Sequence, residues 1–169
     1  MDDRRQRFEA QALPHLDAAY NLARWLSRSP TDADDIVQDA MLRAFRAFDG
    51  FRGGDAKAWL LTIVRNCWLS AGAASRRRGH TGLDEGMAAD DADPEETAIQ
   101  AGHQRRLDAM IARLPDDFRE VLILRELEDM SYREIAEITG SPIGTVMSRL
   151  ARARVLLREF AQESIKEGP

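Results

Sequence analysis

The chain has 169 residues, of which 44% are hydrophobic and 31% are charged, and its formal net charge is -5. This length suits one domain or two small ones, and the single cysteine excludes a disulfide framework and a thiolate zinc cluster. No apolar run approaches the roughly 20 residues that cross a bilayer, and no signal-peptide core follows the N-terminus. We therefore expect a cytoplasmic protein without membrane insertion.

Helical periodicity dominates the first 78 residues, and we find no alternating pattern that would predict a β-strand. A first helix is predicted over 5–28, with a bend at Pro14. A second helix is predicted to begin near Thr31, whose hydroxyl can cap it, and its apolar residues recur every three or four positions. The stretch FDGFRGGD then ends this helix, and a third helix is predicted over 58–70.

The middle of the chain has a different composition. Residues 80–102 carry seven acidic and no basic side chains, and large apolar residues are scarce there. Such a segment cannot bury enough surface to offset its ordering entropy. The composition therefore predicts a flexible acidic linker over 79–94, which joins two small helical domains at 1–78 and 95–169.

The last part of the chain again shows helical periodicity. Ser131 and Glu134 have the spacing of a capping box, and Gly140 suits the left-handed position at a helix end. Ser141 is expected to cap the next helix, with Pro142 in its first turn. This order predicts a helix-turn-helix, whose second helix enters the major groove of DNA. The helices of this part are predicted over 95–113, 116–128, 132–139 and 143–161.

The last helix divides into two faces by residue spacing. The expected buried face comprises Ile143, Val146, Leu150, Ala153 and Leu157. The second face comprises Thr145, Ser148, Arg149 and Arg152. The second face is small and polar at its N-terminal end and then basic, which favours base edges and phosphates as partners. An ordinary solvated amphipathic helix would give the same pattern.

Two longer stretches resemble a known family. TDADDIVQDAMLRAFRAFDGF followed by AWLLTIVRN resembles the first conserved domain of the extracytoplasmic-function (ECF, group IV) sigma factors. LPDDFREVLILRELEDMSYREIAEITGSPIGTVMSRLARAR resembles the second conserved domain. The resemblance covers nearly the whole chain except the linker and the termini. It implies promoter-specific initiation by core RNA polymerase, with contacts to the clamp helices of its largest subunit and the flap of the second. It also implies an anti-sigma factor.

The resemblance also assigns roles to individual residues. Those implied to contact polymerase are Asp35, Gln38, Asp39 and Leu42. Those implied to bind the minus-10 element are Gly53, Gly54, Lys57, Arg65, Asn66, Arg76, Arg77 and Arg78. Those implied to read the minus-35 element are Thr145, Ser148, Arg149 and Arg152. Trp59 and Trp68 could stack on bases, although core packing is the better interpretation for Trp59.

Two other functions fit part of the sequence. A helix-turn-helix regulator that acts without polymerase would account for the C-terminal half only. A sigma-like decoy that captures an anti-sigma factor would have no need for Arg149, Arg152 and the arginines at 76–78. No nucleophile and base set, metal cluster or phosphate loop is apparent, so we expect no catalytic residues, no metal and no cofactor. Cys67 is interpreted as a structural cysteine.

Overall fold

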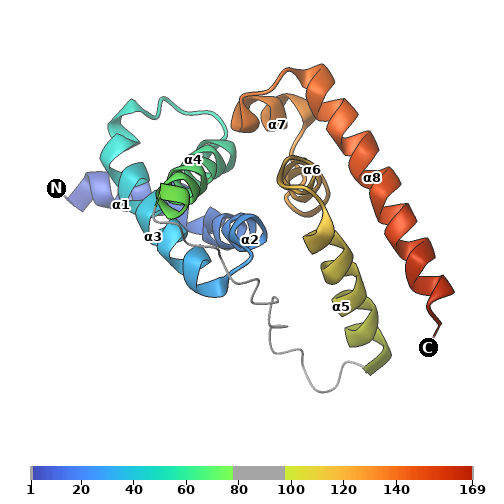
Figure 1. Cartoon of the computed structure of the whole chain (residues 1–169). Coiled ribbons are helices and arrows are strands. Elements are labelled where there is room, and N and C mark those ends of the chain that lie inside the picture. The colour runs from blue at the N-terminus through green and yellow to red at the C-terminus, as the bar shows by residue number, and fades with distance from the viewer. Residues whose placement is uncertain (1, 78–97, 169) are drawn as a thin grey trace.

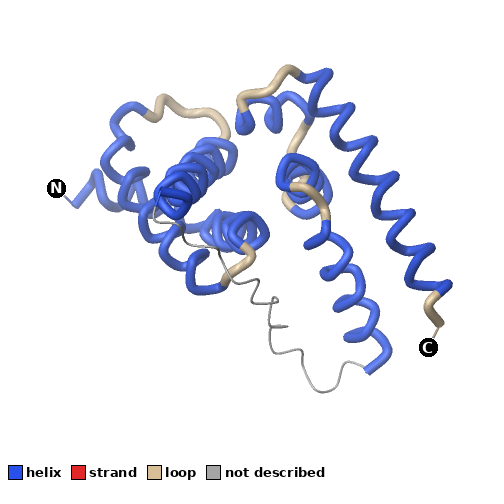
Figure 2. Tube along the Cα trace, in the orientation of Figure 1, coloured by secondary structure: helices blue, strands red, loops and turns tan. Residues whose placement is uncertain are grey.

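A computed structural model describes residues 2–77 and 98–168 (Figure 1). All regular structure within these residues is helical, which confirms the predicted all-α fold class (Figure 2). The predicted linker at 79–94 lies outside the described residues. The elements of the N-terminal half are α1 (Asp2–Ala12), the 3-10 turn η1 (Leu13–His15), α2 (Leu16–Ser27), α3 (Pro30–Ala47), the 3-10 turn η2 (Phe48–Gly50) and α4 (Ala56–Arg77). Those of the C-terminal half are α5 (Ala98–Arg113), α6 (Asp116–Leu122), the π-helical segment η3 (Ile123–Leu127), α7 (Tyr132–Thr139) and α8 (Ile143–Lys166).

The N-terminal half is built around α2, which packs against both α3 and α4. The predicted bend near Pro14 is confirmed, because η1 interrupts the helix there and α2 begins after it. Proline has no N–H to donate to the preceding turn, so a continuous α-helix is broken at this position. The buried face of α2 includes Leu22, Trp25 and Leu26, which contribute to the core of this half.

Helix α3 begins two residues earlier than a cap at Thr31 predicts, and its cap is a different residue. The Ser29 hydroxyl accepts a hydrogen bond from the Asp32 N–H at 3.3 Å, with Pro30 in the first turn. The prediction that Thr31 caps this helix is therefore wrong. A proline is favourable at the first helical position because it lacks only an N–H that would have no helical partner. The capping residue therefore comes directly before it.

An aromatic cluster connects the end of α3 to the start of α4. The rings of Phe51 and Trp59 lie 4.8 Å apart, and both contact Phe48. This confirms core packing for Trp59. The loop between these rings contains Gly53 and Gly54, whose φ angles of 88° and 96° are strained for any residue with a Cβ. The two glycines therefore permit the tight turn into α4.

The C-terminal half contains the predicted helix-turn-helix, formed by α7 and α8. The capping box is confirmed, because Ser131 and Glu134 each accept a hydrogen bond from the other's backbone N–H. Gly140 is in the left-handed conformation with a φ of 65°. The prediction for Ser141 is wrong, because Pro142 occupies the capping position of α8 and provides no side-chain bond. The Ser141 hydroxyl instead accepts a hydrogen bond from Arg149 Nη1 at 3.1 Å.

The predicted buried face of α8 is confirmed at its centre, but the prediction is wrong for the first residue of the helix. Val146, Leu150 and Ala153 are buried, and Leu157 is half-buried against the core. Ile143 is 49% exposed, contrary to the prediction. It is the first residue of the helix, and the packing of α8 against α6 and α7 buries its apolar residues only from Val146 onward.

The two halves are in contact in this structure, through α2 with α6 and through α4 with α7 (Figure 1). Buried apolar residues of both halves belong to one continuous cluster. Arg119 of α6 is fully buried, and its Nε donates to the Trp25 carbonyl oxygen of α2 at 2.9 Å. We call this packing the closed arrangement.

Candidate functional site

The outer side of α3 carries the residues expected to contact polymerase. Asp35 and Gln38 are exposed, and Leu42 is 57% exposed. Asp39 is half-buried and forms an ion pair with Arg43 at 3.1 Å. Three of the four predicted residues are therefore exposed, and the fourth has a partner one turn away.

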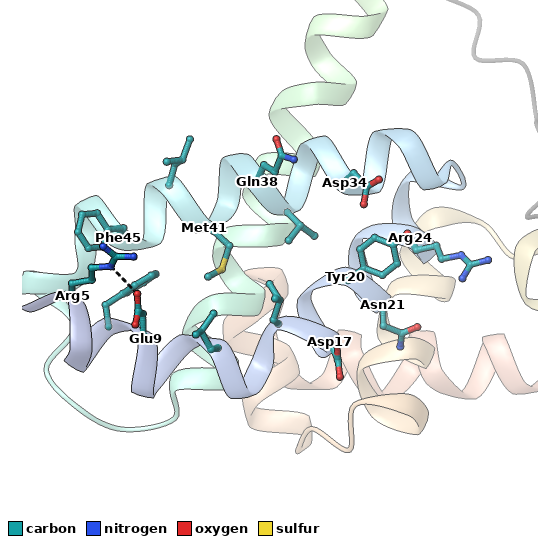
Figure 3. A pocket seen from close by; sticks show the side chains of 15 residues that line it. Arg5, Glu9, Asp17, Tyr20, Asn21, Arg24, Asp34, Gln38, Met41 and Phe45 are labelled. Carbon is teal, nitrogen blue, oxygen red and sulfur yellow. Dashed lines mark hydrogen bonds and ion pairs between the residues drawn. The ribbon is translucent and has the colours of Figure 1, made fainter. Parts of the chain in front are cut away.

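A groove of about 1280 Å³ lies beside this surface, between α1 and α2 on one side and α3 on the other (Figure 3). Its apolar lining includes Phe8, Leu13, Leu16, Val37, Met41 and Leu42. Charged side chains lie at its edge, among them Arg5 and Glu9, which form an ion pair at 2.8 Å. The sequence did not predict the groove, because its two sides come from different helices. Leu13, which lines the groove, is 49% exposed and outside the buried face of α2.

The predicted minus-10 residue Lys57 lies at the interface between the halves. Its Nζ donates to the Glu128 carbonyl oxygen at 2.7 Å and lies 3.3 Å from the Glu128 carboxylate. The same carboxylate accepts a hydrogen bond from Asn21 Nδ2 at 2.8 Å. One residue at the end of η3 therefore binds side chains from both α2 and α4.

Arg65 of α4 has a similar position, because its Nε donates to the carboxylate of Glu120 in α6. Glu120 is 1% exposed. Burial raises the pKa of this carboxyl, and the pairing with Arg65 opposes the increase. Asn66, the next residue, is exposed. Arg65 is therefore held in the interface between the halves, whereas Asn66 is exposed to solvent, although the resemblance assigns both residues to minus-10 binding.

The structure does not describe the side chains of the three arginines at 76–78. Arg76 and Arg77 belong to the last turn of α4, and Arg78 lies outside the described residues. Their predicted contact with the minus-10 strand stays a prediction.

The predicted reading face of α8 is only partly exposed. Ser148 and Arg152 are exposed, whereas Thr145 is half-buried. The Arg149 guanidinium binds Ser141 and lies 3.8 Å from the Asp117 carboxylate, and its side chain is 26% exposed. The solvent-exposed side of α8, which we call its outward side, therefore includes Ser148 and Arg152 but not Arg149. Met147, which the sequence did not single out, is also exposed on this helix.

Cys67 is buried at 2% exposure in α4. Burial raises the pKa of its thiol from 9.0 to about 11, and the charge of Asp39 adds to the increase. A rise of this size means about a hundredfold less thiolate at neutral pH. The thiolate is the reactive form, so the structural interpretation of this cysteine has a physical basis.

We expect Cys67 to react with iodoacetamide at pH 8 about a hundredfold more slowly in the native chain than after unfolding in urea. The physical reason is the low thiolate fraction together with burial. Quantifying the modified protein by mass spectrometry over time measures both rates. Equal rates in the two states would contradict this expectation.

Two other kinds of site are absent from the described part of the chain. No cluster of three or more His, Cys, Asp and Glu side chains there could hold a metal ion. None of the helices at 2–77 and 98–168 has the length and apolar character needed to cross a membrane.

Comparison with known proteins identifies relatives of both halves. Residues 13–78 match the family model for sigma-70 region 2, and residues 104–167 match that for sigma-70 region 4. The chain is 34% identical to the ECF RNA polymerase sigma-E factor of Escherichia coli K12, over 80% of this chain and 76% of that protein. It is 32% identical to the ECF RNA polymerase sigma factor SigE of Mycolicibacterium smegmatis, over 90% of this chain and 61% of that protein's length. Among solved structures, the sigma factor RpoE of Bartonella quintana in complex with the anti-sigma factor NepR has a TM-score of 0.79 and 31% identity, over 93% of this chain and 98% of that one.

Proposed function

The chain belongs to the ECF sigma factors, and we propose on that basis that it binds core RNA polymerase and directs it to specific promoters. Sigma factors are initiation factors and not enzymes, and phosphodiester synthesis belongs to the polymerase. The observation that carries the proposal is the presence of both regions, in this order, in one chain. A helix-turn-helix regulator that acts alone would have no use for region 2. A cytoplasmic location follows from this role.

The test of this proposal is run-off transcription with purified core polymerase. We expect the chain to stimulate transcripts with discrete start sites from a subset of templates taken from its host genome. The core enzyme alone provides the background. Absence of stimulation on every template would refute the proposal.

The polymerase contact is assigned to α3 and the groove beside it. Asp35 and Gln38 supply an exposed polar surface, and Leu42 joins this surface to the apolar lining of the groove. Such a combination fits a helical partner that has both basic and apolar side chains. The clamp helices of the largest subunit are the proposed partner here, and the flap of the second subunit is a further proposed contact.

Replacing Asp35 and Gln38 together by alanine is expected to weaken binding to core polymerase about fivefold. Both side chains are exposed, and polar contacts at the edge of an interface contribute about 1 kcal/mol in total. Competition for core polymerase against labelled wild-type chain measures the change. The matched control is the double replacement of Gln104 and Asp108 on α5, which removes the same two residue types from another exposed pair. Equal affinities for both double variants would place the docking surface elsewhere.

The minus-10 contact is assigned to α4 and the glycine turn before it. Gly53 and Gly54 leave the backbone open to close approach, and Asn66 is exposed farther along α4. Lys57 and Arg65 cannot bind DNA while they bind Glu128 and Glu120. We infer that the closed arrangement opens when the promoter strand is bound.

An anti-sigma factor is the remaining proposed partner. The support is indirect: the Bartonella quintana relative was solved in complex with one. The likeness extends over nearly the whole chain, so it includes both halves. A partner that binds the closed arrangement would keep Lys57 and Arg65 away from DNA.

A further inference from the structure

Helix α8 has a second apolar row in addition to its buried one. Ile143, Met147 and Val155 are 49%, 51% and 45% exposed, and Ala151, between the last two, is also exposed. These four residues are spaced by four, so the row runs along one side of the helix. The buried row at Val146, Leu150 and Ala153 is separate from it. The exposed row therefore contributes nothing to the core of this chain.

Basic side chains lie on both sides of this exposed row. On one side, the polar Ser148 and the basic Arg152 follow Met147 and Ala151 by one position each, and both are exposed. Arg154 lies on the other side, three positions before the half-buried Leu157. From Ser141 to Arg158 the chain has four arginines and no acidic residue. A partner for this surface must combine negative charge with small apolar groups.

The major groove of DNA has this combination. Phosphates border it, and each thymine projects a 5-methyl group into it. A methionine side chain is unbranched and polarizable, so it can adapt its shape to such a group. An apolar side chain that covers a methyl group removes that group from water, which favours the base that carries it.

We propose that Met147, supported by Ala151, packs on the 5-methyl group of a thymine in the minus-35 element and determines base preference there. This inference rests on the proposed function, because it requires α8 to lie in the major groove. Met147 is in the second turn of α8. It is therefore close to the N-terminal end, which is the part of a recognition helix that contacts base edges. Val155 is two turns farther along and beyond that reach.

The experiment uses holoenzyme formed from core polymerase and the full chain. The preferred minus-35 sequence is first selected from a library of promoter duplexes randomised in that element. Each thymine of the selected site is then replaced singly by deoxyuridine, which lacks only the 5-methyl group. We expect one or two of these replacements to weaken binding of the wild-type holoenzyme about three- to fivefold.

The variant Met147→Ala decides whether that loss arises at this residue. We expect its holoenzyme to bind the thymine and deoxyuridine sites equally at the sensitive position. Val155→Ala removes an apolar side chain from the same row and should retain the full wild-type sensitivity. Circular dichroism of both variants checks that the helices are intact, which is expected because Met147 and Val155 are 51% and 45% exposed to solvent.

Three outcomes would overturn the inference. The first is a Met147→Ala holoenzyme that stays as sensitive to deoxyuridine as the wild type. The second is a wild-type holoenzyme that is insensitive at every thymine, although it selects a minus-35 sequence. The third is failure to select any upstream sequence, and only this result would also contradict the proposed role of α8.

Discussion

Replacing Glu120 by lysine is expected to open the closed arrangement and to increase affinity for the minus-10 strand about tenfold or more. Glu120 is buried against Arg65 at the interface of the halves. The substitution places two cations together in a position with little solvent, which costs several kcal/mol unless the halves separate. Separation frees Arg65 and Lys57 for DNA. The apparent affinity rises because a larger fraction of the chain is competent to bind.

Two measurements report this change. Small-angle scattering should show a larger radius of gyration for the Glu120→Lys chain than for the wild type. Titration with a single-stranded oligonucleotide, taken from the nontemplate strand of a promoter that the chain transcribes, should show the tighter binding. The oligonucleotide binds without polymerase in this assay, so the effect of opening is isolated from the effect of docking.

Glu126→Lys is the matched control for this substitution. It adds the same charge to the same half, but Glu126 is exposed and pairs with Arg154 within that half at 2.8 Å. It should leave the radius unchanged and increase DNA affinity only through general attraction. If both variants have the same radius and bind the oligonucleotide equally, the contacts of Glu120 do not restrain the halves.

The helices themselves could be predicted because their apolar residues repeat with the helical period. The capping box at Ser131 and the left-handed Gly140 could also be predicted, since both depend on residues only a few positions apart. The caps of two helices were assigned to the wrong residue. In each case a proline at or next to the helix start shifted the cap, as for Ser29 in place of Thr31.

The closed arrangement could not be predicted from the sequence. Lys57 and Glu128 are 71 positions apart, and each resembles an ordinary surface charge when only its own segment is considered. The same holds for Arg65 and Glu120, which are 55 positions apart. No periodicity links such residues, so only the packing of α2 and α4 against α6 and α7 reveals them. The groove beside α3 was missed for the same reason, since its two sides come from different helices.

Within α8, the structure gives Arg149 and Arg152 different expected roles. The Arg149 side chain is held at the turn before the helix by Ser141, with Asp117 nearby. A guanidinium in this position can bind a phosphate but has limited reach toward the bases. Arg152 is exposed on the outward side, one turn after Ser148, where a bidentate contact with guanine is possible. The two substitutions should therefore have different consequences for sequence preference.

We expect Arg152→Ala to cost about 1–3 kcal/mol on the preferred minus-35 sequence and to relax the preference at one base pair. Arg149→Ala should instead weaken binding equally on all sequences and reduce the slope of log affinity against log salt by about one. Arg158→Ala, farther along α8, is the control and should change both quantities less. Holoenzyme binding to matched promoters that differ only in the minus-35 element, each at several salt concentrations, distinguishes these cases. If only Arg149→Ala altered sequence preference, the side of α8 that reads the bases would be centred on Arg149. The Arg149 side chain faces the turn before α8 in the free chain. That result would therefore require the helix to rotate when it binds DNA.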